Sequence, residues 1–306
     1  MASPEADAFH ALVRQFRDAT IGTSSILPTV EEMRMGAEMT MAVVGVGPAD
    51  VVVTERQLAG RRALRIDHVR GSAPGVILFL HGGAYVLNSI ETHQKLASGI
   101  VSASGVGAVV FDYRMAPEHP FPTAVHDALG AYRALLDEGM PASSIIVSGD
   151  SAGGGLTVAL LVSIRDAGLP QPAGAVLLSP WTDLEGVGET MVTNVGVDLM
   201  VQRETMFAIG AIYLNGADVR SPLASPIYAD LHGLAPLFIQ VGGHEVLLDD
   251  STRLAVLAAH VGVEVRLHVF PEMQHVFQSG LGQLPEADAA VALIGAYIRE
   301  KLDVAR

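Results

Sequence analysis

A serine flanked by small residues is the part of this sequence best suited to chemistry. Ser151 lies in a Gly-Asp-Ser-Ala-Gly run between the apolar segments 145–147 and 156–162. A serine between a strand and a helix, with Gly149 and Gly153 two positions away on either side, has the pattern of a nucleophile elbow. The turn is so tight that bulky side chains at those positions would collide, and it lifts the hydroxyl clear of the sheet. The following helix points N–H donors toward the same place, which favours a developing negative charge.

A glycine-rich turn between a strand and a helix can also bind phosphate. That alternative needs its own signatures, and neither Gly-x-Gly-x-x-Gly nor a Lys-Ser/Thr pair is present at the turn around Ser151. The sequence therefore favours a catalytic serine over a nucleotide site.

An activated serine also needs donors for the oxyanion, and a second glycine run can supply them. His81-Gly82-Gly83 follows the apolar segment 76–80, before the serine turn in the chain. Residues without side chains let backbone N–H groups approach a carbonyl oxygen closely. The pattern predicts an oxyanion hole formed by the N–H groups of Gly82, Gly83 and Ala152.

The base must come from the histidines of the chain. His275 follows the last apolar strand segment, where a side chain can reach back over the carboxyl edge of a sheet. The competing histidines fall on expected helices, inside strands, in the oxyanion loop or beside the acid, and these are His10, His81, His93, His119, His126, His244 and His268. We therefore predict that His275 is the general base.

The orienting acid has three candidates after the apolar segment 237–241, namely Glu245, Asp249 and Asp250. Glu245 lies in the loop directly after the segment, where it could accept a hydrogen bond from the imidazole. Asp249 and Asp250 precede a helical run and could instead cap that helix or complement its dipole. We predict Glu245 as the acid and keep Asp249 as the alternative.

Apolar segments rich in β-branched residues alternate with helix-length segments. They read as strands at 50–53, 63–69, 76–80, 108–111, 145–147, 175–178, 237–241 and 263–270. Such alternation predicts an α/β fold, with a mostly parallel sheet of about eight strands, helices on both faces, and an early hairpin turning at Ala59-Gly60.

Two stretches do not fit the alternation, the first 48 residues and residues 183–225. Apolar side chains recur there at helical spacing, as in the sets Phe9, Leu12, Val13, Phe16 and Val30, Met33, Ala37, Met41, Val44. Both stretches contain clustered methionines, which either pack on the body or form an adaptable pocket wall. We predict a helical cap made of 1–48 and 183–225 over a catalytic core made of 49–182 and 226–306.

Composition narrows the choice of partners. The 306 residues are 50% hydrophobic and carry a net charge of −14, which disfavours nucleic acid and anionic membranes. The absence of cysteine excludes disulfides, thiolate catalysis and cysteine metal sites. The N-terminal residues do not have the pattern of a secretion signal, and the apolar runs are too short to span a membrane. We expect a cytoplasmic protein whose partner is a small, uncharged substrate.

The combined pattern resembles the hormone-sensitive-lipase branch of the α/β-hydrolases, which includes bacterial carboxylesterases and lactone hydrolases. The resemblance spans nearly the whole chain after about residue 48. Its marks are His81-Gly82-Gly83, Asp112-Tyr113-Arg114-Met115-Ala116-Pro117-Glu118-His119-Pro120-Phe121-Pro122, Gly149-Asp150-Ser151-Ala152-Gly153, Ser179-Pro180-Trp181-Thr182-Asp183-Leu184 and His275-Val276-Phe277.

The resemblance implies a serine carboxylesterase with the α/β-hydrolase fold that cleaves short- to medium-chain acyl esters without a cofactor or metal. A lactone hydrolase or amidase would use the same residues. A non-catalytic receptor on this fold is disfavoured because His275 is present. The family commonly has an Asp-x-Leu-x-Asp pattern at the acid position, and the aligned run from Glu245 to Asp249 places glutamate first.

The resemblance also assigns supporting roles. Asp112, Tyr113, Arg114 and Glu118 are expected to brace the oxyanion loop from behind, and Asp150 to brace the serine turn. Members of this family often pair through the last strand, which implies that a homodimer can form there.

Overall fold

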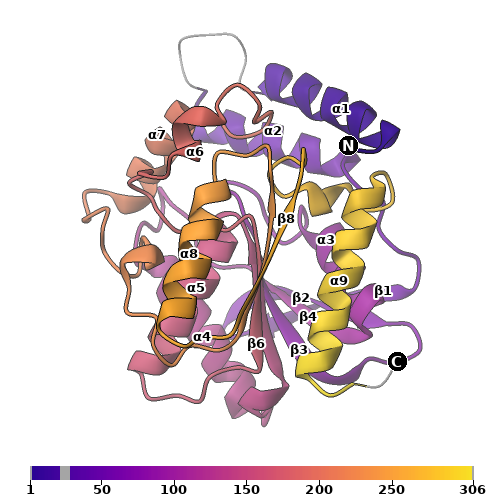
Figure 1. The fold of residues 1–306 in the computed structure, drawn as a ribbon. Helices are drawn as coiled ribbons and strands as arrows, with labels where there is room; N and C mark the ends of the chain where they lie inside the picture. The colour runs from indigo at the N-terminus through magenta and orange to yellow at the C-terminus, as the bar shows by residue number, and fades with distance from the viewer. Residues whose placement is uncertain (1, 21–27, 305–306) are drawn as a thin grey trace.

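The protein folds around one twisted sheet. The computed structural model describes residues 2–20 and 28–304, and Figure 1 shows the sheet between two layers of helices with further helices across one end. The strands are β1 (Val51–Leu58), β2 (Arg61–His68), β3 (Ala73–Leu80), β4 (Val106–Phe111), β5 (Ile145–Asp150), β6 (Gly174–Leu178), β7 (Leu237–Gly242) and β8 (Val265–Phe270).

The helices are α1 (Pro4–Thr20), α2 (Val30–Val43), α3 (Gln94–Ser104), α4 (Thr123–Asp137), α5 (Ala152–Asp166), α6 (Thr190–Thr193), α7 (Arg203–Leu214), α8 (Leu248–His260) and α9 (Pro285–Lys301). Short 3₁₀ turns, η1 to η3, lie at Ala142–Ser144, Pro226–Tyr228 and Phe277–Gly280.

The strand order is β1-β2-β4-β3-β5-β6-β7-β8. β1 and β2 are antiparallel, as are β2 and β4, and the remaining neighbours are parallel. The predicted eight-stranded, mostly parallel sheet is confirmed, with strand ends shifted by a few residues. The predicted hairpin is also found, because Leu58 pairs with Arg61 and both turn residues, Ala59 and Gly60, have positive φ.

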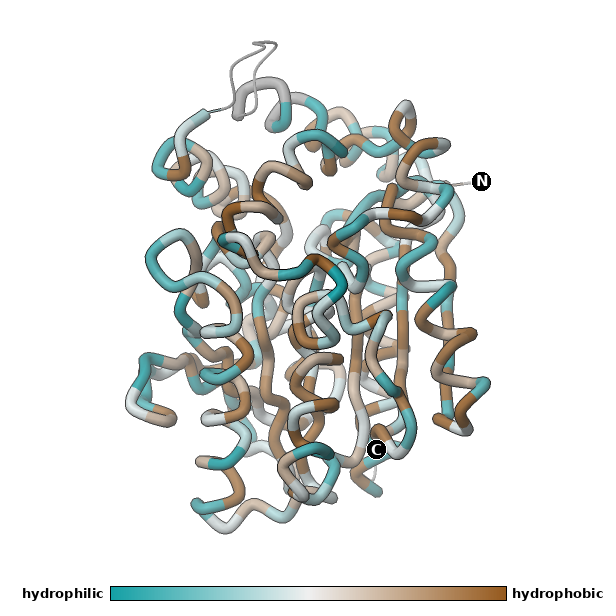
Figure 2. The backbone as a smooth tube through the Cα atoms, turned by 90° about the vertical axis from the view of Figure 1, so that its left-hand side faces the viewer, coloured by the Kyte–Doolittle hydropathy of each residue, from teal (hydrophilic) through white to brown (hydrophobic). Residues whose placement is uncertain are grey.

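Alternation of side chains along the central strands builds two cores. In β3, Ile77 and Phe79 belong to a cluster shared with α3 and α9, whereas Leu78 and Leu80 belong to one shared with α4 and α5. All four side chains are fully buried. Figure 2 shows the hydrophobic stretches running through these central strands. Burial on both faces makes the sheet a rigid platform for whatever follows its strand ends.

The parallel strands bring several loops to one edge of the sheet. Leu80 pairs with Gly149 and Asp150 with Leu178, so β3, β5 and β6 end side by side. β7 and β8 end together in the same way, since Gly242 pairs with Phe270. The residues that follow these ends carry the predicted chemistry.

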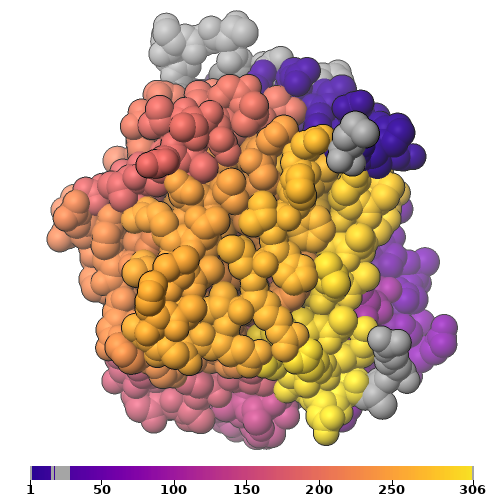
Figure 3. Space-filling view, in the orientation of Figure 1, coloured from indigo at the N-terminus to yellow at the C-terminus, as the bar shows by residue number. Residues whose placement is uncertain are grey.

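Helices α1, α2, α6 and α7 lie across this edge (Figure 1). α2 begins with a capping box, because the hydroxyl of Thr29 accepts from the N–H of Glu32 while the Glu32 carboxylate accepts from the N–H of Thr29. Figure 3 shows α1, in indigo, resting against the yellow C-terminal helix at the surface. The division into cap and core at residues 48, 183 and 225 stays a prediction.

Some side chains of the expected apolar stripes pack in the interior, and others are partly exposed. Phe9, Val13, Met33 and Val44 are buried, while Ala37 and Met41 are half-buried. The side chain of Phe16 lies outside the described residues. No helix in the described part of the chain combines the length and hydrophobicity needed to cross a bilayer.

Candidate active site

The turn after β5 holds Ser151 in a strained backbone conformation. Its φ of 52° and ψ of −122° are rare for a residue with a side chain, and the hydrogen bond from its N–H to Leu178 O (2.8 Å) ties it to β6. A Cβ on Gly149 would collide with the carbonyl of Gly153, and one on Gly153 would collide with the carbonyl of Leu80. Glycine at both positions is therefore a steric requirement of this turn, as the sequence predicts.

The predicted base and acid are in contact. Nδ1 of His275 lies 2.7 Å from Oε2 of Glu245, and both side chains are almost fully buried. Burial disfavours the imidazolium, but the charge and hydrogen bond of Glu245 outweigh burial and raise the pKa of His275 above its usual 6.5. His275 and Ser151 line the same cavity. The arrangement can hold a proton on Nδ1 and leave Nε2 available to accept another.

Asp249 and Asp250 contact the inserted segment instead of the imidazole. Oδ2 of Asp249 accepts from the N–H of Thr190 (3.0 Å), and Oδ2 of Asp250 accepts from the N–H groups of Thr182 (2.7 Å) and Asp183 (2.8 Å). Each carboxylate therefore already has a structural task in joining α8 to residues 182–190. Glu245 is the candidate acid that the geometry favours.

The oxyanion loop requires one correction. The N–H of Gly82 donates to Oδ1 of Asp150 at 3.0 Å, so this predicted donor is already used inside the protein. A Cβ on Gly82 would collide with the same carboxylate. Gly82 is a glycine because Asp150 approaches it closely, and its N–H does not face the cavity.

The two residues after Gly82 are better candidates for oxyanion donors. Gly83 and Ala84 line the cavity with Ser151, and both have positive φ, 112° and 54°. Within the described residues, no hydrogen bond uses the N–H of Gly83, Ala84 or Ala152. The sequence places Ala84 third in this loop, but our prediction assigned donors only to its two glycines. The carboxylate beside Ser151, which needs a donor of its own, is the signal that could have moved the assignment by one residue.

A buried ion pair lies behind this loop. Nε2 of His93 is 3.1 Å from Oδ2 of Asp150, and Nδ1 lies 2.8 Å from the hydroxyl of Thr92. That hydroxyl donates to the carbonyl of Ser89, so it must accept from His93, which places a proton on each ring nitrogen. Burial opposes both charges, yet their mutual attraction raises the pKa of His93 and lowers that of Asp150. The expected bracing role of Asp150 thus includes His93, which the sequence analysis places only on an expected helix.

The four residues expected to brace the loop have different tasks. The hydroxyl of Tyr113 donates to the carbonyl of His81 (2.6 Å), and its ring stacks on the His81 ring at 4.3 Å. Burial lowers the pKa of His81 to about 4, so this ring is neutral. Tyr113 therefore braces the loop directly.

Glu118 acts through α2. It forms a two-pronged ion pair with Arg34 (2.7 and 2.8 Å), which also donates to the carbonyls of Val86 and Ala116. Arg114 pairs instead with Asp127 of α4, and the carbonyl of Asp112 accepts from Arg61. The expectation that Arg114 and Asp112 brace the loop is wrong, because their hydrogen bonds hold other parts of the scaffold.

The acid and base have supports that sequence reasoning did not find. Oε1 of Glu245 accepts from the hydroxyl of Ser179 (2.8 Å) and the N–H of Gly242 (2.6 Å), and the same hydroxyl accepts from the N–H of Val276 (3.1 Å). Ser179 thus joins the acid loop to the base loop. Its place at the end of β6 was a signal in the sequence.

Asp198 and Asn194 reach the same loop from the insertion. Oδ2 of Asp198 accepts from the N–H of Val246 (2.9 Å), and the amide of Asn194 donates to the carbonyl of Glu245 (3.0 Å). Burial raises the pKa of Asp198. No sequence pattern in residues 183–225 marked these two side chains, because the segment folds only against the core.

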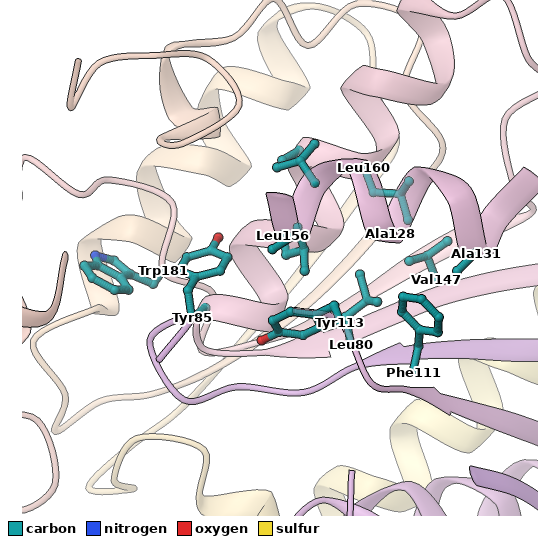
Figure 4. Close-up of a cluster of buried hydrophobic side chains, with 14 of the residues drawn as sticks. Leu80, Tyr85, Phe111, Tyr113, Ala128, Ala131, Val147, Leu156, Leu160 and Trp181 are labelled. Atoms are coloured by element: carbon teal, nitrogen blue, oxygen red, sulfur yellow. The ribbon is translucent and has the colours of Figure 1, made fainter. Parts of the chain in front are cut away.

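The cavity over Ser151 has a volume of about 220 Å³ and is mainly hydrophobic. Core residues supply one side and α2, α7 and residues 200–202 supply another. Trp181 and Tyr85 lie together beside the start of α5 (Figure 4), and Tyr85 stacks on Tyr213 at 3.8 Å. The site therefore brings together a strained serine, a buried carboxylate–imidazole pair and backbone N–H groups without a hydrogen-bond partner in the described residues, around an apolar space.

Comparison with known proteins identifies the family of this chain. Residues 77–279 match the family described as alpha/beta hydrolase fold. The chain is 40% identical over 304 residues, 98% of its length and 97% of the relative's, to an acetyl-hydrolase of Streptomyces hygroscopicus. An esterase of Acinetobacter venetianus is 36% identical over 245 residues, 77% of this chain and 80% of that one.

A solved esterase of the bacterial hormone-sensitive lipase family superposes with a TM-score of 0.92 at 40% identity, covering 99% of both chains. The chain belongs to this family. The α/β-hydrolase fold and the enzyme class read from the sequence, a carboxylic ester hydrolase, are confirmed. The esterase EstE5, whose structure was determined after soaking with p-nitrophenyl butyrate, has a TM-score of 0.92 at 40% identity over 99% of this chain and all of its own.

Proposed function

We propose that this hormone-sensitive-lipase-family enzyme uses Ser151 as nucleophile, His275 as general base and Glu245 as orienting acid. The observation that carries the proposal is the buried 2.7 Å contact between His275 Nδ1 and Glu245, at a cavity that also holds Ser151. Strain at Ser151 supports its role, because a residue kept at φ 52° by two obligatory glycines fixes the direction of its side chain.

The first half of the reaction forms an acyl-enzyme. Nε2 of His275 removes the hydroxyl proton as Oγ of Ser151 attacks the ester carbonyl, and Glu245 stabilises the resulting imidazolium through Nδ1–H. The carbonyl π electrons move to oxygen, where the N–H groups of Gly83, Ala84 and Ala152 stabilise the anion. Collapse of the tetrahedral intermediate breaks the bond to the alcohol oxygen, which takes the proton from His275.

The second half of the reaction repeats these steps with water as the nucleophile. His275 removes a proton from a water molecule as it attacks the acyl carbonyl, and the same backbone donors hold the oxyanion. Ser151 then leaves with the proton from His275, and the carboxylic acid is released. All groups for both halves come from the protein chain, so no cofactor or metal takes part in this proposal.

Short- to medium-chain acyl esters are the proposed substrates. A hydrophobic cavity of about 220 Å³ suits a small apolar acyl or alcohol group. The names of the relatives point the same way, an acetyl-hydrolase and esterases. Lactones and amides can enter the same chemistry, so a panel of aryl esters of increasing acyl length, one lactone and one amide would compare kcat/KM directly. Esters should exceed the amide by several orders of magnitude, since an amine is the poorer leaving group.

The direct test is Ser151→Ala, with kcat/KM measured on p-nitrophenyl butyrate. Removing the nucleophile of such a triad lowers turnover by about 10⁴- to 10⁶-fold. Ser163→Ala is a matched control, because Ser163 is a buried serine in α5, the helix that follows Ser151, and does not line the cavity. A Ser151→Ala protein that folds and keeps more than a tenth of the activity would refute the assignment.

Location and assembly stay proposals as well. The cysteine-free sequence supports the proposed cytoplasmic location. A homodimer through β8 is supported by the place of this strand at the edge of the sheet.

A further inference from the structure

A second cavity lies beside the one over Ser151. Its volume is about 230 Å³, and it is enclosed between the two N-terminal helices and the edge of the active site. α1 contributes Phe9 and Val13, spaced four residues apart on one face, with Arg17 a further turn along. One face of α2 contributes Ala37, Thr40 and Met41, and Val44 follows directly after the helix. The proposed mechanism gives this space no task.

The two cavities share a wall. The residues that line both are Met41, Leu87, Asn88, Met200, Val276 and Ser279. Val276 directly follows His275 in the chain, so the wall begins next to the proposed base. A substrate that extends from Ser151 past this wall reaches α1.

The wall combines a fixed backbone with adaptable side chains. The N–H of Met200 donates to Oδ1 of Asp198 at 2.8 Å, which fixes that part of the insertion. The side chains of Met41 and Met200 are unbranched thioethers, which change shape at small cost. A change in the rotamers of these two side chains therefore reshapes the wall between the two cavities without a movement of the helices.

The chemistry of the second cavity suits a hydrocarbon. Phe9, Val13, Val44 and Leu87 present apolar surface, and the hydroxyl of Thr40 is already used in a 2.8 Å hydrogen bond to the carbonyl of Gly36. Transfer of an alkyl chain from water into such a space is favourable by about 0.8 kcal/mol per methylene, or about three- to fourfold per methylene in kcat/KM.

We propose that the cavity between α1 and α2 is a second substrate subsite, which receives the distal part of an unbranched alkyl chain on esters bound at Ser151. This inference rests on the proposed function, because it places the reacting carbonyl at Ser151. The alkyl chain can belong to the acyl group or to the alcohol. Both sources present the same chemistry, and two substrate series separate them.

The experiment compares Ala37→Phe with Ala42→Phe. Ala37 lines only the second cavity, whereas Ala42 is exposed on the same helix and provides the matched control. One series consists of p-nitrophenyl esters from acetate to dodecanoate, and the other of acetates of primary alcohols of the same lengths. In one series, Ala37→Phe should lower the ratio of kcat/KM for the longer chains to that for the shortest member by about tenfold or more, because the new ring fills the subsite.

The series that responds identifies the source of the chain. If neither series responds to Ala37→Phe while the variant folds as the parent does, the cavity is a packing gap and the proposal is wrong. An equal response to Ala42→Phe would contradict it too, because that side chain lies outside the cavity.

A second variant tests the opposite direction and guards against misfolding of the first. Met41→Ala removes a thioether from the shared wall, so the chain length with the highest kcat/KM should increase by a few carbons. A decrease or no change would overturn the proposal. Failure of the proposed function looks different, since Ser151→Ala would then leave hydrolysis intact at every chain length.

Discussion

The two sides of the active site are supported in different ways. On the side of Ser151, the carboxylate of Asp150 lies against His93, and this partner lowers the pKa of Asp150 despite complete burial. On the side of Glu245 and His275, Asp198 has no cationic hydrogen-bond partner in the described residues, and burial raises its pKa. One side is held by an ion pair and the other by a carboxylate that accepts backbone N–H groups.

The parts of the chain that supply these supports also differ. Asp150 and His93 belong to the core, at a strand end and at the start of α3. Asp198 and Asn194 belong to the segment between β6 and β7, which also lines the cavity through Met200 and Val201. The proposed nucleophile and oxyanion loop are thus held by the core, whereas the proposed acid–base pair also depends on the insertion. Substitutions in the insertion should therefore affect proton transfer by His275 more than they affect the conformation of the serine turn.

The largest effect should come from the acid itself. Glu245→Gln places an amide opposite Nδ1 of His275, which can invert the tautomer and leave no carboxylate to stabilise the imidazolium. We expect kcat to fall by about 10⁴-fold. Asp249→Asn is the matched control and should change kcat by less than about threefold. A loss of turnover in Asp249→Asn alone, with the fold retained, would make Asp249 the acid.

A smaller loss should follow from breaking the ion pair on the elbow side. Asp150→Asn removes the charge that faces His93 and weakens the acceptor for the Gly82 N–H, so the oxyanion loop loses one of its anchors. We expect kcat/KM to fall by about 10²-fold, the effect of misplacing one oxyanion donor. Initial-rate assays with p-nitrophenyl butyrate would measure this kcat/KM. An unchanged kcat/KM would show that the loop is positioned without this pair.

Asp198→Asn should have a weaker effect that carries a signature in pH. The negative charge of Asp198 contributes to the raised pKa of His275, so its removal lowers that pKa. The acid limb of the kcat/KM profile, which reports the base in the free enzyme, should move to lower pH, with kcat reduced by about tenfold or less. Asp218→Asn, an exposed change in the same insertion, should leave the limb in place. A shift of the acid limb to higher pH in Asp198→Asn would show that the charge of Asp198 does not raise the pKa of His275.

The smallest effect on turnover is expected from Asp250→Asn. This substitution should instead change how the free energy of unfolding depends on pH. Burial raises the pKa of Asp250 to about 8, and one of its oxygens has no hydrogen-bond partner in the described residues. Between the ordinary pKa of an aspartate and 8 the folded state binds a proton that the unfolded state has lost, so this group makes unfolding free energy fall as pH rises, by up to about 1.4 kcal/mol per pH unit. Asp250→Asn should flatten that dependence in urea titrations from pH 5 to pH 8. An unchanged slope would place the titration elsewhere.

The same contrast explains what the sequence could predict. Ser151, Gly149, Gly153 and the order of the elements follow from local rules, because a strand, a tight turn and a helix are adjacent in the chain. Glu245 and His275 followed from their order after the last strands. The hydrogen-bond partner of the Gly82 N–H could not be predicted from local sequence, because it depends on how closely Asp150 approaches from a neighbouring strand. Asp198 and His93 lie on segments whose position is decided by tertiary packing, so spacing along the chain carried no signal for them.

We propose that Ser151 is the nucleophile, on the side of the site that the core holds. An organophosphorus ester probe should add one phosphonyl group to the protein as activity disappears, and peptide mass mapping should place it on Ser151. His275→Ala should slow that labelling, because the base no longer activates the hydroxyl. Labelling of another residue, or complete inactivation with no adduct at Ser151, would show that Ser151 is not the nucleophile.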